Sequence, residues 1–204
     1  ALCWAFFQLW YASPLPFTFR FAIFNDTEAR ALHLGIAMFL AYVAYPASKK
    51  AARDRIPIQD WVLGLVASFC GAYLFLFYND LADRPGIPTT MDVVTAAIGL
   101  VLLLEATRRA LGAPMAVLGT VFILYVFLGP YLPDALAHRG ASLERLVSHM
   151  WLTTEGVFGV ALGVSVSYIF IFVMLGSLLD RCGAGNYMMQ VSFSLLGHLR
   201  GGQA

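Results

Sequence analysis

The sequence predicts an all-α integral membrane protein with about six transmembrane helices and one or two amphipathic helices at the membrane interface. Of its 204 residues, 60% are apolar and only 12% are charged, and this charged fraction is about half that of soluble domains. Several apolar stretches also approach the roughly 20 residues that an α-helix needs to cross a bilayer. A net charge of +1 gives no field that would favour nucleic acid or a strongly acidic partner.

Six stretches qualify as membrane spans or nearly do: residues 1–11, 31–46, 59–78, 91–111, 114–132 and 157–179. The first is short, and the chain opens without Met or the charged segment of a signal peptide, so we expect this sequence to be a fragment of a longer chain. Gly112 and Pro114 occupy positions that glycine favours just after a helix and proline favours at the start of the next. The fourth and fifth spans should therefore be antiparallel neighbours joined by a tight turn.

Lysine and arginine in the short loops predict the orientation of the spans. Residues 48–57 carry four basic side chains, and the turn at residues 108–113 carries two. Because cytoplasmic loops are enriched in lysine and arginine, we expect both segments on the cytoplasmic side. The N-terminus is then cytoplasmic, residues 133–156 lie outside, and residues 180–204 return to the cytoplasmic side.

Two amphipathic stretches do not fit a simple span. Between Ser142 and Glu155, apolar residues recur with the period of a helix, which Ser142 can cap and Gly156 can end. We expect a helix that lies in the membrane interface or packs against neighbouring helices. Residues 184–199 mix apolar and polar side chains and are too polar for a lipid-facing span. They form either an interfacial helix on the cytoplasmic side or a helix packed inside protein.

A first group of candidate functional residues, Glu105, Arg108 and Arg109, lies at the cytoplasmic end of the fourth span. The i,i+3 and i,i+4 spacings allow Glu105 to meet either arginine on one helix face. An ionisable group inside a membrane is a functional hypothesis by default. A helix-end ion pair, with arginines that reach toward the interface, explains the same residues, and we favour that interpretation.

A second group lies in the sixth span, where Gly159 and Gly163 form a GxxxG pair followed by Ser165. Small residues allow helices to approach closely, and we favour this packing role. A solute path or an unwound transport segment would use the same residue types.

The pattern offers no catalytic or metal-binding residues. The three cysteines are scattered and form no cluster with histidine, which disfavours a disulfide framework or a zinc site. Neither HExxH nor GxSxG occurs, and the sequence shows no pairing of an acid with a histidine that would build a catalytic site. We predict no enzyme, no cofactor and no metal site.

Specific strings carry the interpretation further. Residues 127–165, "FLGPYLPDALAHRGASLERLVSHMWLTTEGVFGVALGVS", and residues 176–202, "GSLLDRCGAGNYMMQVSFSLLGHLRGG", closely resemble the fused permeases of tripartite ATP-independent periplasmic (TRAP) transporters. Residues 25–47, 83–94 and 102–115 resemble them as well. The nearest branch is the one whose partner is a TAXI-type substrate-binding protein, and the resemblance covers essentially the whole chain.

The resemblance implies two parts. Residues 1–112 resemble the small four-helix membrane scaffold, and residues 113–204 resemble the truncated beginning of the large, DctM-like transport domain. It also implies a permease of the bacterial inner membrane for sodium-coupled secondary import of organic acids. A periplasmic binding protein delivers the solute, and the large part moves it by an elevator-like motion against the fixed scaffold.

In such permeases the sodium and substrate sites are built by later helices of the large part, so we expect them outside this chain and assign no ligand here. Two groups are structural or interface candidates. Near the boundary between the two parts these are Glu105, Arg108 and Arg109, and where the large part begins they are Glu155, Gly156, Gly159, Gly163 and Ser165. Two other classes of protein stay open: a non-transporting membrane scaffold or assembly subunit, and, less favoured, an intramembrane enzyme. The partners implied are the TAXI-type binding protein, the lipid bilayer and the rest of the large transport domain.

Overall fold

A computed structural model describes residues 2–47, 56–133 and 136–196, and within these ranges all regular structure is helical. The fold class predicted from composition is therefore confirmed. The helices are α1 (Leu2–Ala12), α2 (Leu15–Phe19), α3 (Asp26–Ala44), α4 (Ile58–Leu76), α5 (Tyr78–Ala82), α6 (Thr90–Ala110), α7 (Ala113–Leu128), η1 (Gly129–Tyr131), α8 (Leu143–Val147), η2 (Ser148–Leu152), α9 (Val160–Val164), η3 (Ser165–Ile169), α10 (Phe170–Arg181) and α11 (Ala184–Leu196).

Four helical stretches among the described residues are long and apolar enough to cross a membrane: Ile58–Leu76, Thr90–Ala110, Ala113–Tyr131 and Val160–Arg181. They correspond to the predicted third to sixth spans. The predicted first span is the 11-residue helix α1, which at 1.5 Å per residue reaches only about half of a hydrocarbon core. The predicted second span is α3, which has 19 residues but carries Asp26, Glu28 and Arg30 near its start.

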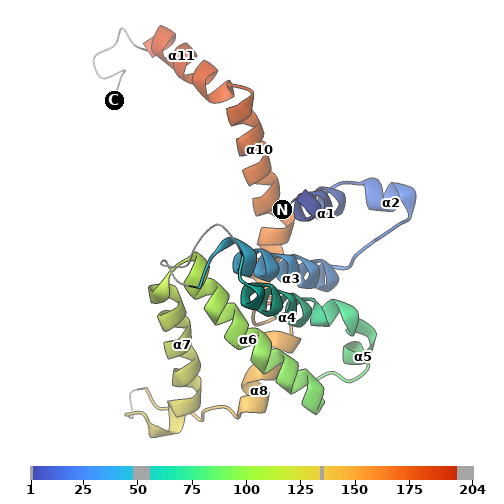
Figure 1. Ribbon diagram of the computed structural model, residues 1–204, viewed down its shortest axis with the longest axis vertical. Coiled ribbons are helices and arrows are strands. Elements are labelled where there is room, and N and C mark those ends of the chain that lie inside the picture. Colours follow the sequence, from blue (N-terminus) through green and yellow to red (C-terminus); the bar gives the residue numbers. More distant parts are fainter. Residues whose placement is uncertain (1, 48–55, 134–135, 197–204) are drawn as a thin grey trace.

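The centre of the molecule is the close pair α3 and α4, crossed by α6 (Figure 1). Gly35 of α3 lies against Gly71 of α4, where a Cβ on Gly71 would come within 2.8 Å of the Gly35 backbone. Ala67 is fully buried in the same interface. Small residues therefore allow the two backbones to pack closely, as they do between membrane helices in general.

The turn between α6 and α7 is as tight as predicted. Gly112 adopts a φ of 98°, a left-handed conformation in which a side chain would be strained, and its N–H donates to the carbonyl of Arg108 at 3.1 Å. Pro114 lies in the first turn of α7. Helices α6 and α7 are consequently neighbours that run in opposite directions.

The amphipathic stretch at residues 142–155 packs against neighbouring helices, which is one of the two placements predicted for it. Ser142 caps α8, accepting a hydrogen bond from the Arg145 N–H. The helix continues as one π-helical turn, η2. Val147 and Trp151 are almost fully buried, because they pack against α6.

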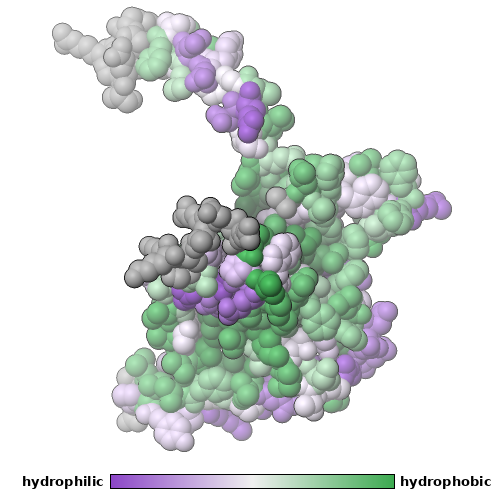
Figure 2. All heavy atoms as spheres, in the orientation of Figure 1, coloured by the Kyte–Doolittle hydropathy of each residue, from purple (hydrophilic) through white to green (hydrophobic). Residues whose placement is uncertain are grey.

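Helices α10 and α11 project from the bundle (Figure 1), and their described residues contain none that is buried. Hydrophobic residues cover most of the visible surface over α3, α4, α6 and α7. Hydrophilic residues gather along the lower edge and in a second patch near the end of α6 that adjoins α7 (Figure 2). A surface of this kind matches a hydrocarbon solvent rather than water.

Candidate functional site

The first polar cluster joins the ends of α3, α4 and α6 and is called here the basic-end cluster: Tyr42, Asp60, Glu105, Arg108 and Arg109. Glu105 accepts two hydrogen bonds of 2.7 Å from Arg108, through Nε and Nη2, and one of 2.8 Å from Arg109 Nε. Both pairings expected from the spacing are therefore present. The Arg109 guanidinium also lies 4.6 Å from the centre of the Tyr42 ring.

Asp60, at the start of α4, is the member of this cluster that sequence reasoning missed. Its Oδ1 accepts a hydrogen bond of 2.8 Å from Arg109 Nη1, and both side chains are less than 10% exposed. Arg109 thus ties α4 to α6, while Arg108 donates to the carbonyl of Ala47, just after the end of α3, at 3.1 Å. The cluster fastens three helix ends, which is the structural role favoured for these residues.

A second cluster surrounds the fully buried Asp92 at the opposite end of α6. Asp92 accepts from the Tyr73 hydroxyl at 2.6 Å and from the Thr89 N–H at 2.7 Å, and it forms an ion pair of 3.2 Å with Arg84. The Thr89–Asp92 pair is a capping box, which satisfies donors at the start of the helix. The T-x-x-D spacing could have revealed the cap, but the pairing with Tyr73 needs the fold.

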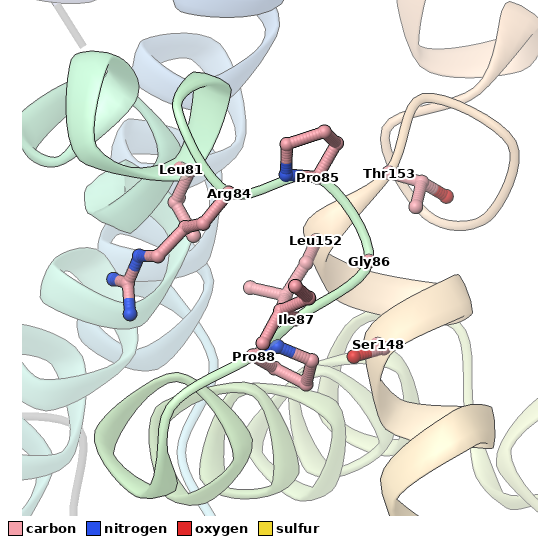
Figure 3. A pocket seen from close by; sticks show the side chains of 9 residues that line it. All are labelled: Leu81, Arg84, Pro85, Gly86, Ile87, Pro88, Ser148, Leu152 and Thr153. Carbon is pink, nitrogen blue, oxygen red and sulfur yellow. The ribbon is translucent and has the colours of Figure 1, made fainter.

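A small pocket of about 170 Å³ lies beside this second cluster, between the loop at residues 84–88 and η2. Figure 3 shows Ser148 and Thr153 on one side and the loop on the other, with the Arg84 guanidinium turned away from the loop. Arg84 is drawn toward Asp92. The pocket therefore offers hydroxyl groups and proline rings but no ion pair.

The third cluster lies where α1 and α3 meet residues 158–165, which include α9 and the start of η3, and is called here the seam cluster: Gln8, Arg30, His33, Gly163 and Ser165. Arg30 forms an ion pair with Asp26, and its Nη1 donates to the carbonyl oxygens of Phe158 and Gly159 at 2.8 and 3.2 Å. The guanidinium covers Gly163, where a Cβ would lie 2.7 Å from the arginine Cζ.

His33 lies at the centre of the seam cluster. Its Nδ1 faces two side-chain donors, the Trp4 Nε1 at 3.2 Å and the Gln8 amide, so this nitrogen is the acceptor. The proton then lies on Nε2, which faces the Ser165 hydroxyl at 3.4 Å. A buried neutral imidazole therefore links α1, α3 and the π-helical turn η3.

The candidate residues that the sequence placed near the predicted start of the large part do not all gather in one place. Gly159, Gly163 and Ser165 lie in the seam cluster or against it. Gly156 forms a tight turn against the Met150 backbone. The Glu155 side chain is 74% exposed and faces His149 Nδ1 at 3.4 Å, so it takes no part in the seam.

The described residues contain no group of three or more histidine, cysteine, aspartate or glutamate side chains placed to hold a metal ion. Cys3, Cys70 and Cys182 are free thiols. The polar clusters connect neighbouring helices within the protein, and each charged side chain in them has an ion-pair or hydrogen-bond partner. Their arrangement supports packing and positioning more directly than bond-making chemistry.

A comparison with known families gives one match: the model for "Tripartite ATP-independent periplasmic transporter, DctM component" matches residues 98–204, just over half of the chain. No curated protein and no solved structure matches this sequence. The matched range begins within α6 and contains the seam glycines, Ser165 and all of α7 to α11.

Proposed function

This chain belongs to the family of the DctM component of tripartite ATP-independent periplasmic transporters, and from this premise we propose that it works in sodium-coupled import of organic acids. It is a component of a membrane permease, with several helices able to cross the bilayer. The family match is the observation that carries the proposal. A periplasmic substrate-binding protein of the TAXI type delivers the solute, a partner that the resemblance of the strings supports.

The proposed division of labour places residues 1–112 in a fixed scaffold and residues 113–204 in the opening of the transport domain. The tight turn at Gly112 supports a boundary there, because it ends α6 sharply. The family match reaches back to residue 98, so α6 borders both parts. The sodium and solute sites are proposed to lie in parts of the transport domain that follow this chain.

The proposed orientation places the basic-end cluster on the cytoplasmic side of the inner membrane. The end of α3, the start of α4 and the end of α6 meet there, as the hydrogen bonds from Arg108 to Ala47 and from Arg109 to Asp60 require. The connection at residues 48–55 adds four basic side chains and one acidic one. This concentration of positive charge supports a cytoplasmic assignment, with α1 starting on the same side.

The test is uptake by the complete permease reconstituted in liposomes, with labelled mono- and dicarboxylates chosen for binding to the partner protein. Uptake should require both an inward sodium gradient and the binding protein, and it should proceed without ATP. Replacing sodium with potassium, or omitting the binding protein, should reduce uptake to that of empty liposomes. Uptake that persists without the binding protein, or that needs ATP, would refute the proposal.

A further inference from the structure

A polar pocket of about 270 Å³ lies at the end of α7 that is remote from the Gly112 turn. Phe127 and Pro130 form one wall, and the segment from Arg139 to Ser142 together with Arg145 forms the other. None of these residues belongs to the three clusters described above. The pocket is therefore a separate feature, opposite to the basic-end cluster along α7.

His138 fixes the loop that carries this pocket. The Gly140 N–H donates to His138 Nδ1 at 3.1 Å, and because a backbone N–H can only donate, Nδ1 is the acceptor. The ring proton then lies on Nε2, which donates to the Tyr125 carbonyl at 3.1 Å. The same ring covers Gly129, where a Cβ would overlap it. The next residue, Ala141, donates its N–H to a carbonyl of α7 at 3.3 Å, so the loop is held at several points.

Two arginines line the pocket with their charges unpaired. The arginines of the three clusters all form ion pairs with carboxylates. Within the part of the chain that the structure describes, the guanidinium groups of Arg139 and Arg145 form no ion pair and no hydrogen bond, and no carboxylate lines the pocket. Both side chains are exposed, and each presents five N–H donors.

Ser142 adds a third donor to the same wall. As the cap of α8, its Oγ accepts a hydrogen bond from the Arg145 N–H at 3.3 Å. Its own proton has no acceptor within residues 136–196, so the hydroxyl can donate to a ligand. The pocket thus combines two guanidinium groups and one hydroxyl, all donors.

This set of donors fits a phosphate. A carboxylate presents two oxygens in one plane, and a single arginine can satisfy both of them. A phosphate presents oxygens on several sides, so two arginines and a hydroxyl can each take one. Guanidinium groups suit phosphate recognition in particular, because they are planar, always charged and weakly hydrated.

The position of the pocket favours a phosphate that belongs to a lipid. The stretch Ala113–Tyr131 is long and apolar enough to cross a membrane, and Phe127 and Pro130 lie in its last turns. Tyr131, which ends this stretch, is 86% exposed, as aromatic residues at a membrane interface are. The pocket therefore lies at the level of the headgroups, with its apolar wall toward the hydrocarbon.

We propose that this pocket binds the phosphate of an anionic phospholipid between Arg139 and Arg145, with the Ser142 hydroxyl as a further donor. Phe127 and Pro130 would contact the glycerol and the start of an acyl chain. Free phosphate has the same chemistry, so the experiment separates the two sources. The site needs no transport activity and stands apart from the proposed function; in the proposed orientation the lipid belongs to the outer leaflet.

The experiment measures how fast phenylglyoxal modifies individual arginines of the complete permease in nanodiscs, with peptide mass spectrometry as the readout. The nanodiscs contain phosphatidylcholine alone, phosphatidylcholine with phosphatidylglycerol, or phosphatidylcholine with inorganic phosphate in the buffer. The reagent is uncharged, so the charge of the membrane does not change its local concentration. Arg20 is the internal control, because it is exposed, lines none of the described pockets and lies on the same side in the proposed orientation.

Phosphatidylglycerol should slow the modification of Arg139 and Arg145 about fivefold, the usual gain in affinity for one basic residue near an anionic membrane surface. The rate at Arg20 should stay unchanged, and inorganic phosphate should protect less than the lipid. In Arg145→Gln, Arg139 should lose most of its protection, because the two side chains hold one phosphate. The matched Arg20→Gln should leave it protected. The comparison of membranes uses the unaltered protein, so it stands even if Arg145→Gln does not fold.

Four results would overturn the proposal. Equal rates in all three preparations would show that the pocket binds no phosphate, and equal slowing of Arg20 would show a general effect of the charged surface. Protection of Arg139 that survives Arg145→Gln would show that the two arginines share no ligand. Protection by inorganic phosphate but not by phosphatidylglycerol would remove the lipid as the source.

Discussion

Replacing Gly99 with alanine should loosen the attachment of η2 to the bundle. Gly99 lies in α6 against the indole of Trp151, which is fully buried, and a Cβ there would lie 2.6 Å from Trp151 Cε2. Non-bonded carbon atoms approach to about 3.5 Å, so the ring would have to move by about 1 Å. It is held in place because its Nε1 donates to the Cys70 carbonyl at 3.0 Å and its edge meets the Phe158 ring.

The size of the effect follows from three contributions. Overpacking a buried site costs about 2 kcal/mol, and weakening the indole hydrogen bond adds about 1 kcal/mol. Alanine is a better helix former than glycine by about 1 kcal/mol, which offsets part of the loss. The free energy of unfolding should therefore fall by about 2 kcal/mol.

The assay is the thermal stability of the detergent-purified permease carrying a fluorescent fusion, followed as the loss of the monodisperse peak in size-exclusion chromatography. Gly176→Ala is the control, because a Cβ on Gly176 meets nothing within 4 Å and gains only the helix propensity. Trp151→Phe should restore part of the loss in Gly99→Ala, since the smaller ring removes the clash. Equal midpoints for Gly99→Ala and Gly176→Ala would refute the reasoning.

Two further predictions use the same assay. Arg109→Gln should lower the free energy of unfolding by about 2 kcal/mol, because it leaves the buried Asp60 without its charged partner. The matched change Arg108→Gln, at a more exposed side chain, should lower it less. The reverse order would contradict the assignment of the buried pair. Tyr42→Phe should cost about 1 kcal/mol, because the hydroxyl of this fully buried residue donates to the Leu102 carbonyl at 2.9 Å, and an unchanged midpoint would show that this hydrogen bond contributes nothing.

The spanning helices were predictable because lipid imposes a strong local pattern. The predicted spans at residues 59–78, 91–111 and 114–132 agree with the observed stretches within one or two residues at each end. The span predicted at 157–179 runs from Val160 to Arg181. The π-helical turn η3 inside it escaped notice, because one extra residue in a turn hardly changes an all-apolar pattern.

The polar clusters were predictable only where their members are close in sequence. Glu105 and its two arginines lie within one helical turn, and their spacing suffices to pair them. Arg109 and Asp60 are 49 residues apart, and only the antiparallel arrangement of α4 and α6 brings them together. The same applies to Tyr73 and Asp92, whose contact depends on how α4 crosses α6.

The GxxxG pair shows most clearly what a local pattern leaves open. Gly159 and Gly163 predict a place of close approach, but the group that approaches Gly163 is the Arg30 guanidinium rather than another helix backbone. Arg30 binds main-chain carbonyls at residues 158 and 159, so its hold on this segment does not depend on the side chains there. If residues 113–204 move as part of the proposed transport domain, this segment must either stay in place beside α3 or break these hydrogen bonds. Breaking them would leave the guanidinium with only its ion pair to Asp26 beside the membrane, so the first course costs less.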